Sequence, residues 1–200
     1  SFFNNADALL DRVRYIENIR NRLAPKTFTT IDEIGNILGD QSGASIPVAY
    51  WNLSGAMYTY IYIELSKIGI DIAGESQLVG YPSQYPDVTM IDWKDAKPNA
   101  RYWVLKLLKD NFGPGDKLVN TDVNSSQVVA QAFITTKGKK LLLINKRNKD
   151  ILLELPAGIK DAEMFSVDGA SNENPPIQVH LTGTSITLKP FAVSVIDIKD

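Results

Sequence analysis

The chain has 200 residues, 44% of them hydrophobic, which is enough for one large domain or two small ones with a substantial core. Its 21 basic and 23 acidic residues give a formal charge of -2 without long runs of either sign, which argues against nucleic-acid and anionic-membrane partners. There is no cysteine and one histidine, so disulfides, thiolate chemistry and transition-metal ligation are not expected. No apolar stretch reaches the roughly 20 residues that span a bilayer. Because phosphate-binding and dinucleotide-binding motifs are also absent, we expect no metal and no cofactor.

The first half of the sequence alternates helical and extended patterns. Residues 5–23 place apolar side chains at spacings of three, four and seven, with an asparagine available as N-cap and Pro25 as a stop, which predicts an amphipathic helix. Residues 27–34 predict a strand and 36–47 a loop. Residues 49–68 are too long for a normal strand and predict a helix.

The same alternation continues to residue 112. Residues 70–78 predict a strand, 79–95 a long loop and 98–112 a helix that ends at Gly113. Helices and strands that alternate with short connections are typical of parallel strands with crossover helices. We therefore expect two parallel strands and three helices in this half.

After Asp122 the pattern changes to short β-rich runs about ten residues apart, separated by turn clusters, which is typical of an antiparallel β-sandwich. The sequence predicts an α/β domain over residues 1–115 and an all-β sandwich domain over 116–200. His180 lies in one of the sandwich strands and is interpreted as structural. The predicted strands are 128–135, 140–145, 151–155, 164–167, 177–180, 185–188 and 192–198.

One carboxylate, Glu33, lies at the end of the first predicted strand, beside Gly35. A strand that ends in a carboxylate is how a parallel barrel presents a catalytic acid at its C-terminal rim. The alternative is that Asp32 and Glu33 are simply a solvated pair at a strand end. Because side chains alternate along a strand, we expect Asp32 to face the side opposite to Glu33.

Three stretches resemble a known group of enzymes. They are Phe-Thr-Thr-Ile-Asp-Glu-Ile-Gly at 28–35, the helix end and strand at 65–77, and Lys-Pro-Asn-Ala-Arg-Tyr-Trp-Val-Leu-Lys-Leu-Leu at 97–108. Followed by a β-sandwich that closes on residues 190–196, they look like the last quarter of a retaining clan A glycoside hydrolase barrel. The final helix is similar to that of the heparanase and β-glucuronidase group, family 79, and families 39, 51 and 30 share the layout. The resemblance covers nearly the whole chain and implies the last part of a (β/α)₈ TIM barrel followed by a C-terminal β-sandwich.

The resemblance also implies roles for individual residues. It places Glu33 at the nucleophile, at the end of the seventh barrel strand. It places Glu75 and Gln77 at the end of the eighth strand, where a polar side chain can hydrogen-bond a sugar hydroxyl. Trp51, Tyr81 and Trp93 lie in or beside the loops that follow these strands, where aromatic rings stack on sugars, although Trp51 and Trp93 could equally fill the core.

Two features depart from a complete enzyme of this kind. The acid/base of these families is carried by an Asn-Glu pair on the fourth strand, and no such pair precedes Glu33. A full barrel takes about 250 residues, yet only about 115 precede the predicted sandwich. We therefore expect the chain to act with an upstream barrel fragment on a carbohydrate substrate, and the family implies an extracellular or secreted enzyme. The alternative function is a non-catalytic carbohydrate-binding or interaction module.

Overall fold

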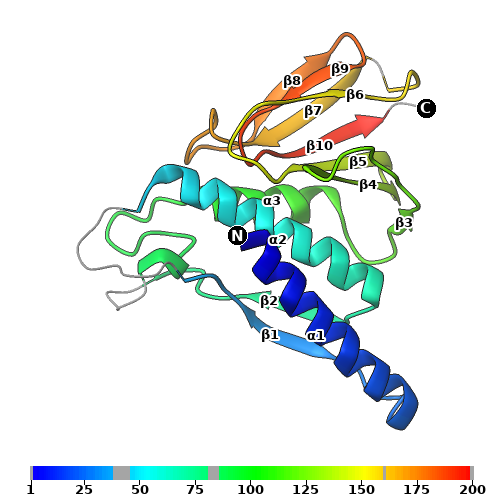
Figure 1. Cartoon of the computed structure of the whole chain (residues 1–200). Coiled ribbons are helices and arrows are strands. Elements are labelled where there is room, and N and C mark those ends of the chain that lie inside the picture. Colours follow the sequence, from blue (N-terminus) through cyan, green and yellow to red (C-terminus); the bar gives the residue numbers. More distant parts are fainter. Residues whose placement is uncertain (1, 38–45, 81–85, 160, 199–200) are drawn as a thin grey trace.

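The computed structural model describes residues 2–37, 46–80, 86–159 and 161–198, and these form an α/β structure arranged in layers (Figure 1). A pair of strands lies at one end, helices lie in the middle, and the remaining strands form the other end. The elements are α1 Phe2–Leu23, β1 Thr30–Ile34, α2 Val48–Ile68, β2 Ile72–Glu75, the short 3₁₀ helix η1 Pro86–Val88, α3 Ala100–Asn111, β3 Lys117–Val119, β4 Val128–Thr135, β5 Gly138–Asn145, β6 Ile151–Glu154, β7 Ala162–Val167, β8 Ile177–Leu181, β9 Ser185–Leu188 and β10 Val193–Ile198.

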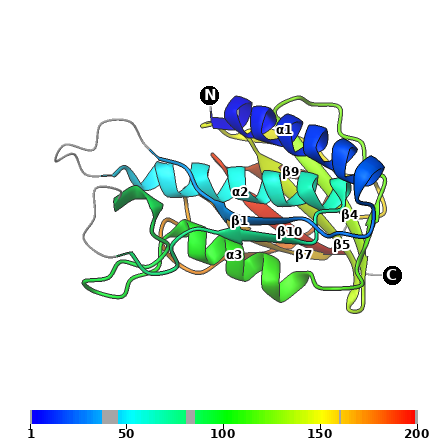
Figure 2. The ribbon, with the colours of Figure 1, turned by 90° about the horizontal axis from the view of Figure 1, so that it is seen from below.

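The three helices predicted from periodicity are all present and run side by side (Figure 2). Helix α1 buries one apolar stripe against α2, with Phe3, Leu10 and Val13 in the core. Helix α2 lies between α1 and α3 and is buried on most sides, which explains its weakly amphipathic sequence. It ends at Gly69, whose φ of 86° lets its N–H reach the carbonyl oxygens of Leu65 and Ser66.

Strands β1 and β2 pair in parallel, as the alternation predicted. Thr30 and Ile31 pair with Ile72 and Ala73, but the next pair is Ile34 with Glu75, so Asp32 and Glu33 both lie opposite the single residue Gly74. This extra residue is a β-bulge, which bends a strand and changes the direction of its side chains.

The antiparallel strands predicted after Asp122 are all present, with ends shifted by one or two residues. Six of them form one sheet in the order β3-β4-β5-β10-β7-β8, and β6 and β9 form a separate pair. Strand β3, three exposed residues paired with β4, was not predicted, because so short a run has no readable period.

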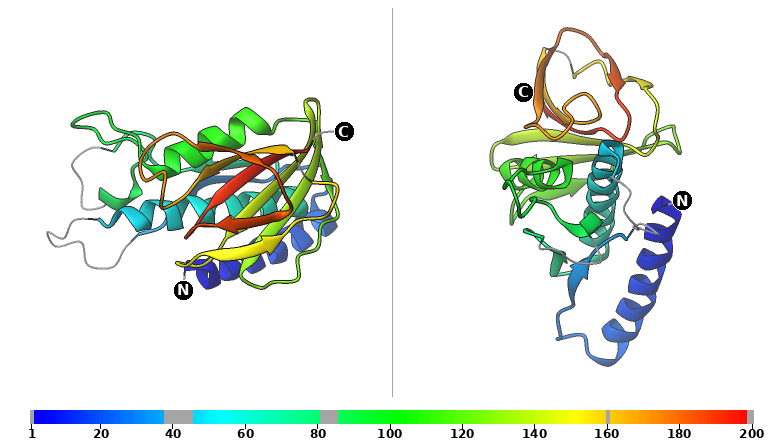
Figure 3. Two further views of the ribbon diagram at one scale, coloured as in Figure 1. Left: turned by 90° about the horizontal axis from the view of Figure 1, so that it is seen from above. Right: turned by 90° about the vertical axis from the view of Figure 1, so that its left-hand side faces the viewer.

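The central strands of the six-stranded sheet are buried on both faces, so β5 is apolar at successive positions rather than alternate ones. Leu142 and Ile144 pack into the core shared with the helices, whereas Leu141 and Leu143 pack toward β6 and β9. Seen from the side, α2 and α3 lie between this sheet and the β1–β2 pair (Figure 3). One continuous core therefore joins the helical half to the six-stranded sheet.

The far face of the β1–β2 pair is uncovered within the part of the chain that the structure describes (Figure 1). Ile31 and Ile34 point to the helical side and pack into the core. None of the described helices is long and apolar enough to cross a membrane.

The bulge predicts a strict requirement for glycine at position 74. A Cβ there would lie 2.5 Å from the Asp32 carbonyl oxygen, a backbone atom that cannot move aside without separating the strands. We expect Gly74→Ala to lower the free energy of unfolding by about 1 to 3 kcal/mol, measured by denaturant unfolding. Gly113→Ala is the matched control, because nothing lies within 4 Å of a Cβ at that position; equal effects of the two substitutions would contradict the account.

Candidate active site

The bulge at the end of β1 presents two carboxylates at the surface. Asp32 and Glu33 are both exposed, and the residues on either side, Ile31 and Ile34, face the helices. The bulge inserts one residue between Ile31 and Ile34, so the regular alternation on which the expected opposite orientation of Asp32 and Glu33 depends does not continue through this segment. Asp32 accepts a hydrogen bond from the Thr30 hydroxyl (3.1 Å).

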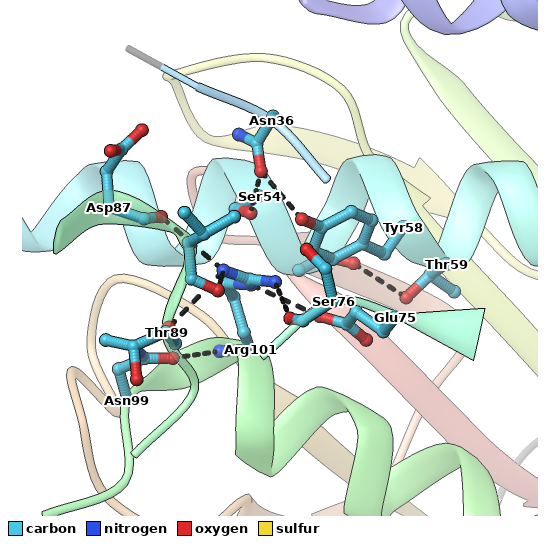
Figure 4. A network of polar contacts seen from close by, with 12 residues as sticks. Asn36, Ser54, Tyr58, Thr59, Glu75, Ser76, Asp87, Thr89, Asn99 and Arg101 are labelled. Atoms are coloured by element: carbon cyan, nitrogen blue, oxygen red, sulfur yellow. Dashed lines mark hydrogen bonds and ion pairs between the residues drawn. The ribbon is translucent and has the colours of Figure 1, made fainter. Parts of the chain in front are cut away.

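The backbone that follows Glu33 is held by α2. The buried Asn36 side chain accepts hydrogen bonds through Oδ1 from the hydroxyls of Ser54 (2.8 Å) and Tyr58 (2.9 Å) (Figure 4). The backbone carbonyl oxygen of Asn36 accepts a third hydrogen bond, from the Tyr50 hydroxyl (3.0 Å). Gly35 passes so close to β2 that a Cβ would lie 2.8 Å from the Ser76 hydroxyl oxygen. The exit of β1 is therefore fixed three residues beyond Glu33.

Glu75, at the end of β2, points away from the exposed carboxylates. It pairs across the strands with Ile34, which faces the core, and its side chain is only 3% exposed. Its Oε1 accepts a hydrogen bond from Arg101 Nε (3.2 Å), and Oε2 accepts one from the Tyr62 hydroxyl (3.5 Å). The structure thus places the Glu75 carboxyl against Arg101 and Tyr62, and the expectation that it binds a sugar hydroxyl stays a prediction.

Gln77 lies two residues further on, at the rim. Its φ of 55° is in the left-handed region, which is uncommon for a residue with a side chain and is often found at functional sites. Its carbonyl oxygen accepts the N–H of Met90 (3.1 Å). Gln77 is partly exposed and remains a candidate for contact with a substrate.

The three candidate aromatic residues differ in exposure. Trp51 lies in the first turns of α2, is 7% exposed and packs edge-on against Tyr50 (5.1 Å between ring centroids), so it belongs to the core and has no free face for a sugar. Trp93 is 48% exposed in the loop before α3, with the Lys94 ammonium 5.8 Å from its ring centroid. Tyr81 lies outside the described residues.

Sequence reasoning missed the buried polar residues Asn36 and Arg101. Arg101 was read only as part of a helix motif, yet it is 1% exposed and pairs with Glu75. The available signal was an arginine in the first turn of a helix, where the helix dipole does not favour a cation. No group of three metal-ligating side chains that could hold a metal ion is found in the described ranges.

Comparison with known proteins identifies the fold. No protein-family model matches the sequence, and no curated protein matches it at a significant level. Among solved structures, the chain is similar to a family 86 β-porphyranase from the human gut bacterium Bacteroides plebeius, with TM-score 0.67, 15% identity, and coverage of 98% of this chain and 39% of that one. It is also similar to a family 30 endoxylanase from Clostridium papyrosolvens (TM-score 0.57, 12% identity, 90% and 44% coverage) and to a conserved exported protein from Bacteroides fragilis (TM-score 0.67, 13% identity, 96% and 43% coverage).

These likenesses concern the fold. The chain spans less than half the length of each of these proteins. Its structural neighbours include glycoside hydrolases of families 30 and 86, of which family 30 is among those that the sequence motifs resemble.

The buried Glu75 predicts a stability that falls as pH rises. Burial raises the pKa of the Glu75 carboxyl from 4.5 to about 7, although Arg101 and Tyr62 act to lower it. The folded state therefore keeps the proton up to about pH 7, whereas the unfolded state loses it near 4.5, so this contribution is complete below 4.5 and is lost by about 7. We expect the free energy of unfolding to fall by up to about 3 kcal/mol across that window, measured by denaturant titration at successive pH values.

Glu75→Gln should remove this pH dependence, because the amide does not titrate. Glu173→Gln, at an exposed carboxylate, should leave it unchanged. A slope that persists in Glu75→Gln would mean that another group titrates in this window.

Proposed function

We propose that the chain is the C-terminal portion of a retaining glycoside hydrolase and that Glu33 is its nucleophile. In this reaction an ionised carboxylate attacks the anomeric carbon, forms a glycosyl ester and is released by water, while a second carboxylic acid about 5 Å away protonates the leaving oxygen. The observation that carries the proposal is that Glu33 is exposed at a β-bulge near the C-terminal end of a parallel strand. The likeness to family 30 and 86 enzymes supports it at the level of the fold.

The β1–β2 pair supports the interpretation that the chain is part of a larger barrel. Two parallel strands cannot close a barrel, and large apolar side chains stay exposed along the outer side of α1, in the segment that follows it, and on and after β2. Exposed apolar surface of this extent marks an interface. An upstream fragment of the same enzyme would cover it and supply the missing acid/base. The exposed residues are Tyr15, Ile16, Leu23, Phe28, Ile72, Leu78 and Val79.

The substrate in this proposal is a carbohydrate, bound at the rim formed by the ends of β1 and β2. Gln77 and the exposed ring of Trp93 are the described residues able to contact it, one by hydrogen bonding and the other by stacking. Tyr81 keeps its place in the proposal from its position in the sequence. An extracellular location follows from the nature of polysaccharide substrates, and one structural neighbour is an exported protein.

The proposal predicts that Glu33→Gln abolishes turnover without unfolding the protein. Glutamine keeps the shape of the side chain but lacks the nucleophilic charge, so kcat should fall by at least about 10³-fold. Because Glu33 is exposed, the melting temperature should stay nearly unchanged. The measurement is reducing-sugar release from xylan, porphyran and neoagarooctaose by the chain together with its upstream portion.

Glu154→Gln is the control, since this exposed carboxylate lies on β6, in the β6–β9 pair. It should keep full activity. Activity of Glu33→Gln within about tenfold of the unmodified enzyme would exclude Glu33 as the nucleophile.

A further inference from the structure

Among the residues that the structure describes, Arg101 is the largest fully buried side chain, and its guanidinium contacts neighbours on three other elements. Its Nε donates to Glu75 at the end of β2, and the guanidinium lies over the Tyr58 ring of α2, 4.7 Å from the centroid. The Asn99 side chain caps α3 by accepting the Arg101 backbone N–H (3.0 Å), which fixes the start of the helix from which Arg101 extends.

The remaining guanidinium N–H groups donate hydrogen bonds to backbone carbonyl oxygens rather than to side chains. Nη2 donates to the carbonyl oxygen of Ser76 (3.3 Å), the residue after β2. Nη1 donates to the carbonyl oxygens of Asp87 (3.4 Å), Val88 and Thr89 (3.3 Å), at the end of η1 (Figure 4). One side chain thus joins the end of β2 to a stretch of chain eleven to thirteen residues further on.

Backbone hydrogen bonds also join the residues after β2 to the residues after η1. The N–H of Met90 donates to the Gln77 carbonyl oxygen (3.1 Å), and the N–H of Ile91 donates to the Leu78 carbonyl oxygen (2.9 Å). These two bonds place Gln77 beside the stretch that leads to Trp93. Their geometry depends on the position of residues 87–89, which Arg101 holds.

We propose that Arg101 is a positioning residue that fixes Gln77 and the segment 87–93 at the rim by holding the backbone carbonyl groups of Ser76 and residues 87–89. Glu75 accepts a hydrogen bond from the Nε–H group of Arg101. That the rim binds a carbohydrate rests on the proposed function, but the positioning itself does not. Only arginine offers five N–H groups in one rigid plane, so lysine keeps the charge but cannot make these contacts together.

The first experiment measures amide hydrogen exchange in the full chain. The variant is Glu75→Gln/Arg101→Met, in which replacing both residues avoids leaving the buried Glu75 carboxyl without its partner. We expect exchange at the amides of Met90 and Ile91 to become at least about tenfold faster, while the amides of β5 keep their protection. Arg101→Lys should show the same local change.

The matched control is Lys140→Met, which removes another buried cation, one bonded to Asn111 and Asp197 on the far side of α3. It should leave exchange at Met90 and Ile91 unchanged relative to β5. Protection lost equally at all amides in the double variant would show that Arg101 acts only on global stability and would overturn the proposal. Unchanged exchange at Met90 and Ile91 would overturn it as well.

The second experiment connects the positioning to substrate binding, in the chain together with its upstream portion and with neoagarooctaose and xylohexaose as probes. Arg101→Lys should raise KM about tenfold with kcat within threefold of the unmodified enzyme, because Arg101 acts on the binding rim and not on the reacting atoms. A fall in kcat at constant KM would overturn the role in binding. If the unmodified enzyme turns over neither probe, the proposed function fails on these substrates, and the exchange experiment still decides whether Arg101 fixes the rim.

Discussion

The structure of the rim depends on one buried cation. Arg101 reaches from the first turn of α3 between the β1–β2 pair and α2, where Glu75 accepts its Nε–H and backbone carbonyl groups accept its other N–H groups. Burying a guanidinium without partners would cost several kcal/mol. The carbonyl groups of Ser76 and of residues 87–89 therefore have to lie within reach of Arg101, and this requirement sets the positions of these two parts of the chain.

The two strands that end at this rim have different roles, set by which way their last side chains point. In β1 Asp32 and Glu33 lie in the bulge opposite Gly74 and are both exposed, while Ile34 reaches the core. In β2 the register turns Glu75 toward the helices, where its carboxyl accepts a hydrogen bond from Arg101. Two carboxylates near the ends of neighbouring parallel strands thus lie in different environments, Glu33 exposed and Glu75 buried against Arg101.

The helices and the antiparallel strands could be predicted from the sequence because their periods are long and regular. Residues 49–68 were resolved as a helix by length alone, and the structure confirms it as α2. The orientation of individual carboxylates could not be predicted, because the bulge at Asp32 and Glu33 and the burial of Glu75 depend on contacts with Gly74 and Arg101, which are distant in sequence. Trp51 was undecided for the same reason: its position on α2 favours both a rim and a core location, and tertiary packing places it in the core.

The fold is shared with glycoside hydrolases that act on several polysaccharides, and a fold hosts many functions, so the chemistry has to be tested at the residue. The most direct test of the central claim is to trap the covalent intermediate. The complete enzyme is treated with 2,4-dinitrophenyl 2-deoxy-2-fluoro glycosides of xylobiose and galactose, and the labelled peptide is identified by mass spectrometry. The account predicts a fluoroglycosyl ester on Glu33. An ester on Asp32, or on any other carboxylate, would contradict it.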